Sequence, residues 1–280
     1  MKYKIVSDSS SNIFHLADVD FASVPLKICT SDREYVDTPA LDVDEMIEDL
    51  RRHRGKSGSA CPNPGEWIEA FGDAELIYCV TISSNLSGSC STAMQAAREY
   101  MQAHPDRRVI IFDSLSAGPE MMLIIEKIRE CALTGMSSDE IEAVVRAYQQ
   151  RTRTLFCLQS LNNLARNGRI SPAAAKLAGV LGIRVTGKAS GQGTLEMLGK
   201  IRGERKALEG VFVEMLANGF CGGRLRISHC RNGEAAEQLR EMALAAHPGC
   251  DVEILSTGAL CSFYAERGGL IIGYEGAAEA

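Results

Sequence analysis

Serine hydroxyls gather in one segment of the chain, directly after a strongly apolar stretch. Residues 76–82 are apolar and β-branched, which predicts a strand, and an alanine-rich helical pattern begins at Ser89. Between them lie Ser83, Ser84 and Ser87. A strand–loop–helix turn directs backbone N–H groups and the positive end of the helix dipole at one point, and serines add donors without adding charge. The segment therefore predicts a binding site for an anion.

Two further apolar runs also end in polar residues, which are Asp8-Ser9 and Asp113-Ser114. Strand and helix patterns alternate over this half of the chain, which predicts a doubly wound parallel sheet. Ligands bind such sheets outside the carboxyl ends of the strands, so these polar ends should converge on one crevice. We expect Asp8 and Asp113 to satisfy loop N–H groups, because a bare acid would repel a bound anion. Ser9 fits a helix cap as well as it fits a ligand contact.

Composition and charge exclude several classes of protein. The chain has 280 residues, of which 45% are hydrophobic, enough for two domains with cores of their own. A net charge of −6 and the absence of any Lys/Arg run argue against a nucleic-acid partner. Neither a membrane span of ~18 apolar residues nor a signal-peptide pattern is present, so we expect a cytoplasmic protein without stable membrane insertion. No two of the ten cysteines form a C-x-x-C pair, which predicts free thiols and no metal or other cofactor.

The regular alternation of strand and helix patterns ends near residue 151. Two β-rich runs, 183–188 and 194–200, flank Gly191-Gln192-Gly193 and predict a hairpin. Further expected helices are 204–217 and 234–246, and further expected strands are 155–158, 224–229, 251–255 and 270–274. The predicted fold class is α/β with two domains and a ligand buried between them. A parallel doubly wound sheet is expected in residues 1–153, and a mixed or antiparallel α/β domain in residues 154–280.

Two local expectations concern the first domain. Residues 22–28 have the pattern of one continuous strand, whereas the Gly, Ser, Asn and Pro residues of 55–64 are typical of a loop. Within that loop, Gly55-Lys56-Ser57 resembles the end of a phosphate-binding P-loop. Position 50 is Leu, so the first glycine of that motif is missing, and we expect no nucleotide site there.

Several short motifs, taken in chain order, resemble those of the DegV family. They are Val6-Ser7-Asp8-Ser9-Ser10 and the segments 59–66, 82–88, 113–116 and 164–170. The resemblance covers essentially the whole chain. It implies a two-domain α/β protein that buries one long-chain fatty acid between its domains. It also implies the acyl-carrying subunit of bacterial fatty acid kinase, which has no catalytic site of its own and whose separate ATP-binding subunit phosphorylates the carboxylate.

The resemblance further implies a site for the fatty acid carboxylate. Ser59 matches the first hydroxyl of the family's Thr/Ser-Ser-Gln-Pro loop, and Ser83 and Ser84 match its Ser-Ser-x-Leu-Ser-Gly loop. The family's Gly-Gly-Arg-Ile turn corresponds to residues 167–170, which makes Arg169 the cation that pairs with the carboxylate. Without the family match, Arg169 would be interpreted as a surface cation or a charge at a helix C-terminus.

One departure from the family pattern lies near the C-terminus. The family often uses a His after Gly-Ala, but here Leu260 follows Gly258-Ala259. The hydroxyl of Ser262 or Tyr264 is a candidate replacement for that donor. The remaining candidates, at neighbouring strand ends or one helical turn away, are Ser9, Ser114 and Arg166.

Two other functions fit parts of the sequence. A serine hydrolase would use Ser84 or Ser89 as its nucleophile, but no Gly-x-Ser-x-Gly elbow is present and none of the five histidines lies in a triad-like pattern. A carrier or sensor of another small carboxylate would need the same anion loop with a shorter pocket. Mass spectrometry of the ligand released from purified protein would distinguish these possibilities.

Overall fold

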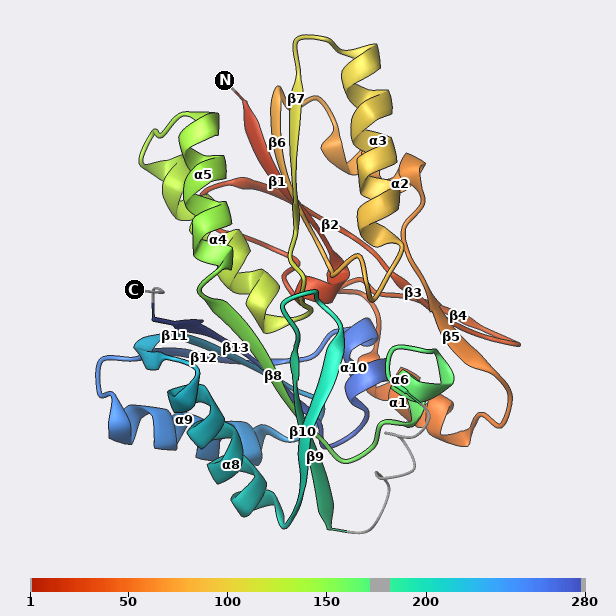
Figure 1. Cartoon of the computed structure of the whole chain (residues 1–280). Coiled ribbons are helices and arrows are strands. Elements are labelled where there is room, and N and C mark those ends of the chain that lie inside the picture. The colour runs from red at the N-terminus through yellow and green to blue at the C-terminus, as the bar shows by residue number, and fades with distance from the viewer. Residues whose placement is uncertain (1, 172–181, 278–280) are drawn as a thin grey trace.

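Two sheets with different strand directions organise the molecule (Figure 1). The computed structural model describes residues 2–171 and 182–277. In the N-terminal sheet the strand order is β2-β1-β6-β7, and all neighbouring strands are parallel. Its strands are β1 (Tyr3–Asp8), β2 (Asp20–Val24), β6 (Leu76–Thr81) and β7 (Arg108–Asp113). Parallel strands need crossover connections, and helix α3 (Ser89–Ala103) makes the one from β6 to β7.

Helices pack on both faces of the parallel sheet, as Figure 1 shows. On one face, a cluster that includes Trp67, Phe71 and Tyr100 is fully or almost fully buried. On the other face, apolar side chains of α4 pack into the larger core of the domain. The helices are α2 (Pro64–Phe71) and α3 (Ser89–Ala103) on the first face, and α4 (Pro119–Leu133) and α5 (Ser138–Gln149) on the second.

The C-terminal sheet is mixed, with the order β10-β9-β8-β13-β11-β12. Its neighbouring strands are antiparallel except for β11 and β12, which are parallel. Its strands are β8 (Thr152–Leu158), β9 (Ile183–Ala189), β10 (Leu195–Arg202), β11 (Phe220–His229), β12 (Asp251–Ser256) and β13 (Leu270–Gly276). Helices α8 (Glu204–Ala217) and α9 (Gly233–Ala246) pack against this sheet. The predicted two-domain α/β fold class is confirmed.

Helix α4 joins the two domains, because it packs on β1 and β6 of the first sheet and on β8, β11 and β13 of the second. The close approach depends on Gly273 of β13, where an added Cβ would come within 2.4 Å of the Glu120 nitrogen. Further along the helix, Glu126 accepts from Arg226 of β11 at 2.8 and 2.9 Å. Burial raises the pKa of Glu126, and the guanidinium opposes that rise. The interface is therefore both packed and ionic.

A small antiparallel sheet lies beside the parallel one and corrects two expectations. Its strands are β4 (Glu34–Val36), β3 (Lys27–Thr30) and β5 (Ser57–Ala60), in the order β4-β3-β5. Residues 22–28 do not form one strand, because Pro25 has a fixed φ and no N–H, and it separates β2 from β3. Residues 55–64 are not a loop throughout, because β5 pairs with β3 through backbone groups that need no apolar side chains.

Short helices complete the fold. They are the 3₁₀ turn η1 (Ser9–Ser11), α1 (Val43–Arg52), α6 (Asn162–Arg166) and α10 (Ala259–Ala265). Helix α10 was not predicted, because a seven-residue apolar run does not separate a helix from a strand. It packs against α1, β3 and α6 and so contacts both domains.

Candidate functional site

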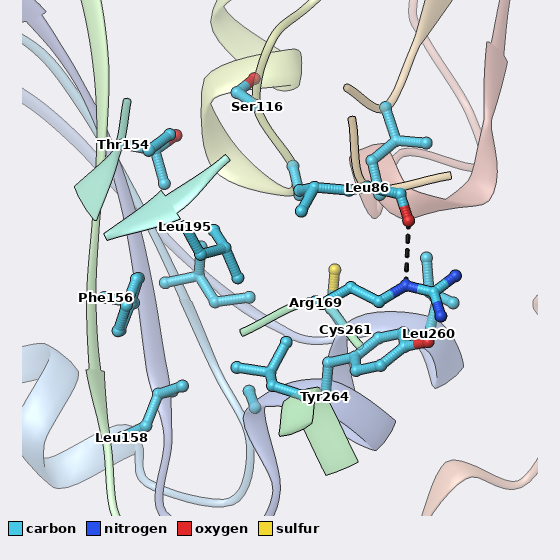
Figure 2. A pocket seen from close by; sticks show the side chains of 16 residues that line it. Leu86, Ser116, Thr154, Phe156, Leu158, Arg169, Leu195, Leu260, Cys261 and Tyr264 are labelled. Atoms are coloured by element: carbon cyan, nitrogen blue, oxygen red, sulfur yellow. Dashed lines mark hydrogen bonds between the residues drawn. The ribbon is translucent and has the colours of Figure 1, made fainter. Parts of the chain in front are cut away.

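An apolar cavity lies beside α6 and α10, where the two domains meet (Figure 2). It holds about 690 Å³ of space free of protein atoms, with the space at its mouth included. Most of its described lining residues are apolar: Ile82, Leu86, Ala117, Phe156, Leu158, Leu164, Ala189, Leu195, Leu260, Cys261, Ala265 and Ile271. The polar ones are Ser116, Thr154, Arg169 and Tyr264. Such a lining favours a ligand with a large apolar part and a small polar one.

Strand β8 forms one wall of the cavity. Its alternate residues Thr154, Phe156 and Leu158 line the space, because successive side chains of a strand point to opposite faces. Phe156 lies opposite Gly187 of β9, and a Cβ at position 187 would come within 2.0 Å of the Phe156 ring. The glycine therefore leaves the room that the ring occupies.

Arg169 is placed by the C-terminal end of α6. Gly168 has a φ of 74°, its N–H donates to the Ala165 carbonyl at 3.1 Å, and the Arg169 N–H donates to the Leu164 carbonyl at 2.8 Å. These two bonds form a Schellman motif, in which glycine supplies the left-handed residue. The Arg169 side chain then turns toward the cavity, and its Nε donates to the Leu86 carbonyl at 3.0 Å (Figure 2). Among the described residues, no carboxylate forms an ion pair with Arg169.

Tyr264 lies next to this guanidinium and is hydrogen-bonded to Ser59. The Arg169 Cζ is 5.7 Å from the centre of the Tyr264 ring, a cation–π distance. The Tyr264 Oη and the Ser59 Oγ are 2.7 Å apart. Ser59 comes from β5 and Tyr264 from α10, so the N-terminal and C-terminal parts of the chain contribute one hydroxyl each.

Helix α10 is held in place by a buried carboxylate. Asp37 accepts from the N–H groups of Ala259 at 2.7 Å and Leu260 at 3.1 Å, and from the Ser9 Oγ at 2.9 Å. Negative charge at a helix N-terminus interacts favourably with the unpaired N–H groups there. Burial nevertheless raises the pKa of Asp37, and these hydrogen bonds oppose the rise. Asp37 thus fixes the helix that carries Leu260 and Tyr264.

The two predicted loop serines lie outside the described lining of the cavity. The buried Ser83 Oγ donates to the Gly193 carbonyl of the β9–β10 turn at 2.7 Å. Gly193 has a φ of 72°, and a Cβ there would come within 2.2 Å of the Ser83 Oγ, so the contact requires glycine. Ser84 is exposed, and its N–H donates to Asp113 at 3.2 Å. This loop therefore joins the two domains in the structure.

A buried carboxylate, Asp8, accepts hydrogen bonds from the residues on either side of the serine loop. Asp8, at the end of β1, is fully buried and accepts from the Ile82 N–H at 2.9 Å and the Ser89 Oγ at 2.6 Å. It also accepts from the hydroxyl of Ser10. Burial raises the pKa of Asp8, and the hydrogen bonds oppose this rise. The prediction that Asp8 satisfies loop N–H groups agrees with this geometry.

The other candidate residues have partners elsewhere or face solvent. The Ser9 Oγ bonds Asp37, the Ser114 Oγ donates to the Ser116 carbonyl at 3.2 Å, and the Ser262 Oγ lies 2.6 Å from the Thr257 Oγ1. Arg166 is exposed. None of them is among the described lining residues. Of the candidates named from the sequence, the structure brings Arg169 and Tyr264 to the cavity, with Ser59 bonded to Tyr264.

Other kinds of site are not apparent in residues 2–171 and 182–277. No group of three or more His, Cys, Asp or Glu side chains there is arranged to hold a metal ion. The ten cysteines are free thiols. No helix in these residues has the length and apolar character needed to cross a membrane.

A family model described as "Uncharacterised protein, DegV family" matches residues 2–275. The chain belongs to the DegV family. A DegV domain-containing protein of Streptococcus pneumoniae is 40% identical over 279 residues, which is 98% of this chain and 99% of that protein. The predicted family membership is confirmed.

Solved DegV structures match the fold closely. One is a DegV family protein from Eubacterium eligens loaded with heptadecanoic acid, with a TM-score of 0.97, 41% identity, and coverage of 98% of this chain and 100% of that one. Another is the Streptococcus pneumoniae fatty acid kinase (Fak) B3 protein loaded with linoleic acid, with a TM-score of 0.97, 40% identity, and coverage of 99% and 100%. Both of these DegV relatives hold a long-chain fatty acid.

Proposed function

We propose that this protein binds one long-chain fatty acid in the cavity between its domains and needs no cofactor to do so. The observation that carries the proposal is the position of Arg169 at one side of a space whose other described lining residues are mostly apolar (Figure 2). Arg169 is the one cationic side chain among the described lining residues. A cavity of this kind suits a molecule with one carboxylate and a long hydrocarbon tail. The two similar proteins that hold fatty acids support the same ligand class.

The energetics assign different roles to the two ends of the ligand. Burial of a sixteen-carbon tail contributes about 12 kcal/mol at ~0.8 kcal/mol per methylene, an upper bound before the cost of ordering the chain. A carboxylate taken out of water costs several kcal/mol unless it is paired and hydrogen-bonded. Arg169 would supply the charge, and the hydrogen-bonded pair of Ser59 and Tyr264 would supply one O–H donor beside it. The tail therefore provides affinity, and the head group provides orientation.

The carboxylate end would be available to a second protein. We propose that the partner is an ATP-binding fatty acid kinase subunit, which phosphorylates the carboxylate to an acyl phosphate. The similar Fak B3 protein supports this role, and use of ATP by the partner favours a cytoplasmic location. In this role the chain is an accessory subunit and not the catalyst.

The two alternatives have less support from the geometry. A serine hydrolase would need a histidine beside its nucleophile, but no described lining residue is a histidine. The Ser89 hydroxyl donates to Asp8, and Ser84 is exposed outside the cavity. A carrier of a short carboxylate would leave most of the apolar lining without a ligand to contact.

Two measurements test the proposal. Organic extraction of purified, folded protein should release a C14–C18 fatty acid in near-stoichiometric amount, identified by mass spectrometry. Extracts without such an acid from protein that also fails to bind added palmitate would overturn the lipid-binding proposal. Acyl phosphate should form when ATP and a fatty acid kinase subunit are added, and not with this chain alone. Turnover by this chain alone, lost in Ser84→Ala, would favour the hydrolase.

A further inference from the structure

A second cavity borders the apolar one, and many of its described lining residues are charged or polar. It holds about 1340 Å³ of space free of protein atoms, counted with its opening to solvent. Its described lining includes the charged residues Asp113, Glu120, Arg146, Arg153, Lys188 and Glu196. Thr154 and Ala189 line both cavities, so the two spaces share a thin partition.

The change from apolar to polar occurs along strand β8. Residues 152, 154, 156 and 158 share one face of this strand, because side chains alternate. Phe156 and Leu158 line the apolar cavity, Thr152 lines the polar one, and Thr154 lines both. Figure 2 shows Thr154, Phe156 and Leu158 one after another along this wall. The boundary between the two spaces therefore lies at Thr154.

Two neighbouring elements also have residues that border each cavity. On β10, Leu195 lines the apolar cavity, and Glu196, whose side chain points to the other face of the sheet, lines the polar one. In the loop after β7, Leu115 borders the polar cavity and Ala117 the apolar one. A partition that spans several elements is a property of the fold rather than of a single side chain.

Thr154 is held in one orientation by Glu120. The Thr154 Oγ1 donates to the Glu120 carboxylate at 2.5 Å, and the Thr152 Oγ1 donates to its other oxygen at 2.7 Å. All three residues are at most 6% exposed. Glu120 borders the polar cavity and not the apolar one, so the Thr154 hydroxyl is turned to the polar side. This leaves the Thr154 methyl group for the apolar side.

We propose that Thr154, oriented by Glu120, is the end wall of the acyl cavity and sets the longest fatty acid that the protein binds well. The inference rests on the proposed fatty-acid-binding function. Each methylene placed against the apolar lining raises affinity about fourfold. A chain long enough to pass Thr154 would enter a space lined by Arg153, Lys188 and Glu196, where further methylenes gain little apolar contact and displace the water around these charges.

The test is an affinity series for saturated acids from about C10 to C20, delivered from cyclodextrin and measured by displacement of a monomeric fluorescent acid. For the wild-type protein, affinity should rise with length and then stop rising at one chain length. Thr154→Leu should move that break to shorter acids. Thr154→Ser removes the methyl but keeps the hydroxyl for Glu120, so it should fold normally and move the break to longer acids. Leu158→Ala, on the same face of β8, is the matched control and should lower affinity without moving the break.

The possible results are distinguishable. A break that stays in place in both Thr154 variants, or that Leu158→Ala moves instead, would overturn the assignment of the end wall while leaving fatty acid binding intact. If the wild-type protein binds no acid of any length, the proposed function itself fails, and the end wall fails with it.

Discussion

The hydroxyl oxygens of Ser59 and Tyr264 lie 2.7 Å apart, although 205 residues separate them in the chain. Ser59 lies in β5 opposite Ile28, and Tyr264 lies on α10 beneath the Arg169 guanidinium. This bond connects strand β5 of the small antiparallel sheet to helix α10, beside Arg169 in the lining of the apolar cavity. The bond uses one of the two hydroxyl protons, so the pair can donate the other to a carboxylate placed beside Arg169.

Removal of either hydroxyl should weaken fatty acid binding. Tyr264→Phe keeps the ring beside Arg169 and loses only the Oη, and Ser59→Ala loses the Oγ. A single hydrogen bond contributes about 0.5–1.5 kcal/mol, so each change should reduce affinity by about 2- to 13-fold. Because the two groups share one bond, the double variant should lose less than the sum of the two single losses. Strictly additive losses in such a cycle would mean that the pair does not act as one unit.

Arg169→Ala should reduce fatty acid affinity much more than Arg166→Ala. Arg169 lines the cavity, and a hydrogen bond to a charged group contributes about 1.5–3 kcal/mol, which corresponds to about 10- to 150-fold in affinity. Arg166 is exposed on the preceding turn and provides a matched control with the same charge change. Equal affinities of the two variants would place the carboxylate elsewhere. Arg169→Lys should recover only part of the loss, because a lysine lacks the planar guanidinium.

Asp37→Asn should destabilise the protein and weaken ligand binding indirectly. The carboxylate accepts two hydrogen bonds from the N-terminus of α10 and one from the Ser9 Oγ, and an amide would place an N–H group against one of these donors. A buried group left without its partner costs about 1–3 kcal/mol, so the free energy of unfolding should fall by that amount in urea denaturation. Unchanged stability would mean that the start of α10 is held by other contacts. Glu140→Gln, at an exposed capping box, is a control that should cost less.

The larger features of the fold could be predicted from the sequence because they depend on periodic patterns. The alternation of apolar strands and helical segments predicted the parallel sheet, and the Gly191-Gln192-Gly193 turn predicted the β9–β10 hairpin. The elements that were missed are short. Strand β5 consists of Ser, Gly and Ala, and its position depends on backbone pairing with β3, which leaves no apolar signal.

The candidate site was predicted less completely. A hydroxyl group can donate to or accept from many kinds of partner, so its partner depends on which groups the fold places beside it. Asp8 and the serine loop were correctly expected at neighbouring strand ends, and Asp8 accepts hydrogen bonds from Ile82 and Ser89 on either side of that loop. Tyr264 was one of two possible replacements for a histidine, and no sequence pattern indicated that it pairs with Ser59. The alternation Thr152, Thr154, Phe156, Leu158 is visible in the sequence, yet its meaning depends on which cavity each residue borders.

Glu120 should make stability depend on pH between about 4.5 and 7. Burial raises the pKa of this carboxyl to about 7, and the hydroxyls of Thr154 and Thr152 oppose the rise. A folded-state pKa above the unfolded value means that the protonated form stabilises the fold at low pH. That contribution is complete below about pH 4.5 and is lost as the pH rises through about 7. The loss amounts to about 3 kcal/mol, from ~1.4 kcal/mol for each pH unit of the shift.

Glu120→Gln isolates this effect because the amide does not titrate. In urea denaturation of delipidated protein, the free energy of unfolding of the wild type relative to Glu120→Gln should therefore fall between pH 4.5 and 7 and then level off. Thr152→Val removes one donor that holds the pKa of Glu120 down, so the fall should extend to higher pH in that variant. A relative stability that stays constant across this range, or that increases with pH, would show that Glu120 is ionised at little cost. The Glu120 carboxylate would then be solvated from the polar cavity rather than held by the two threonines alone.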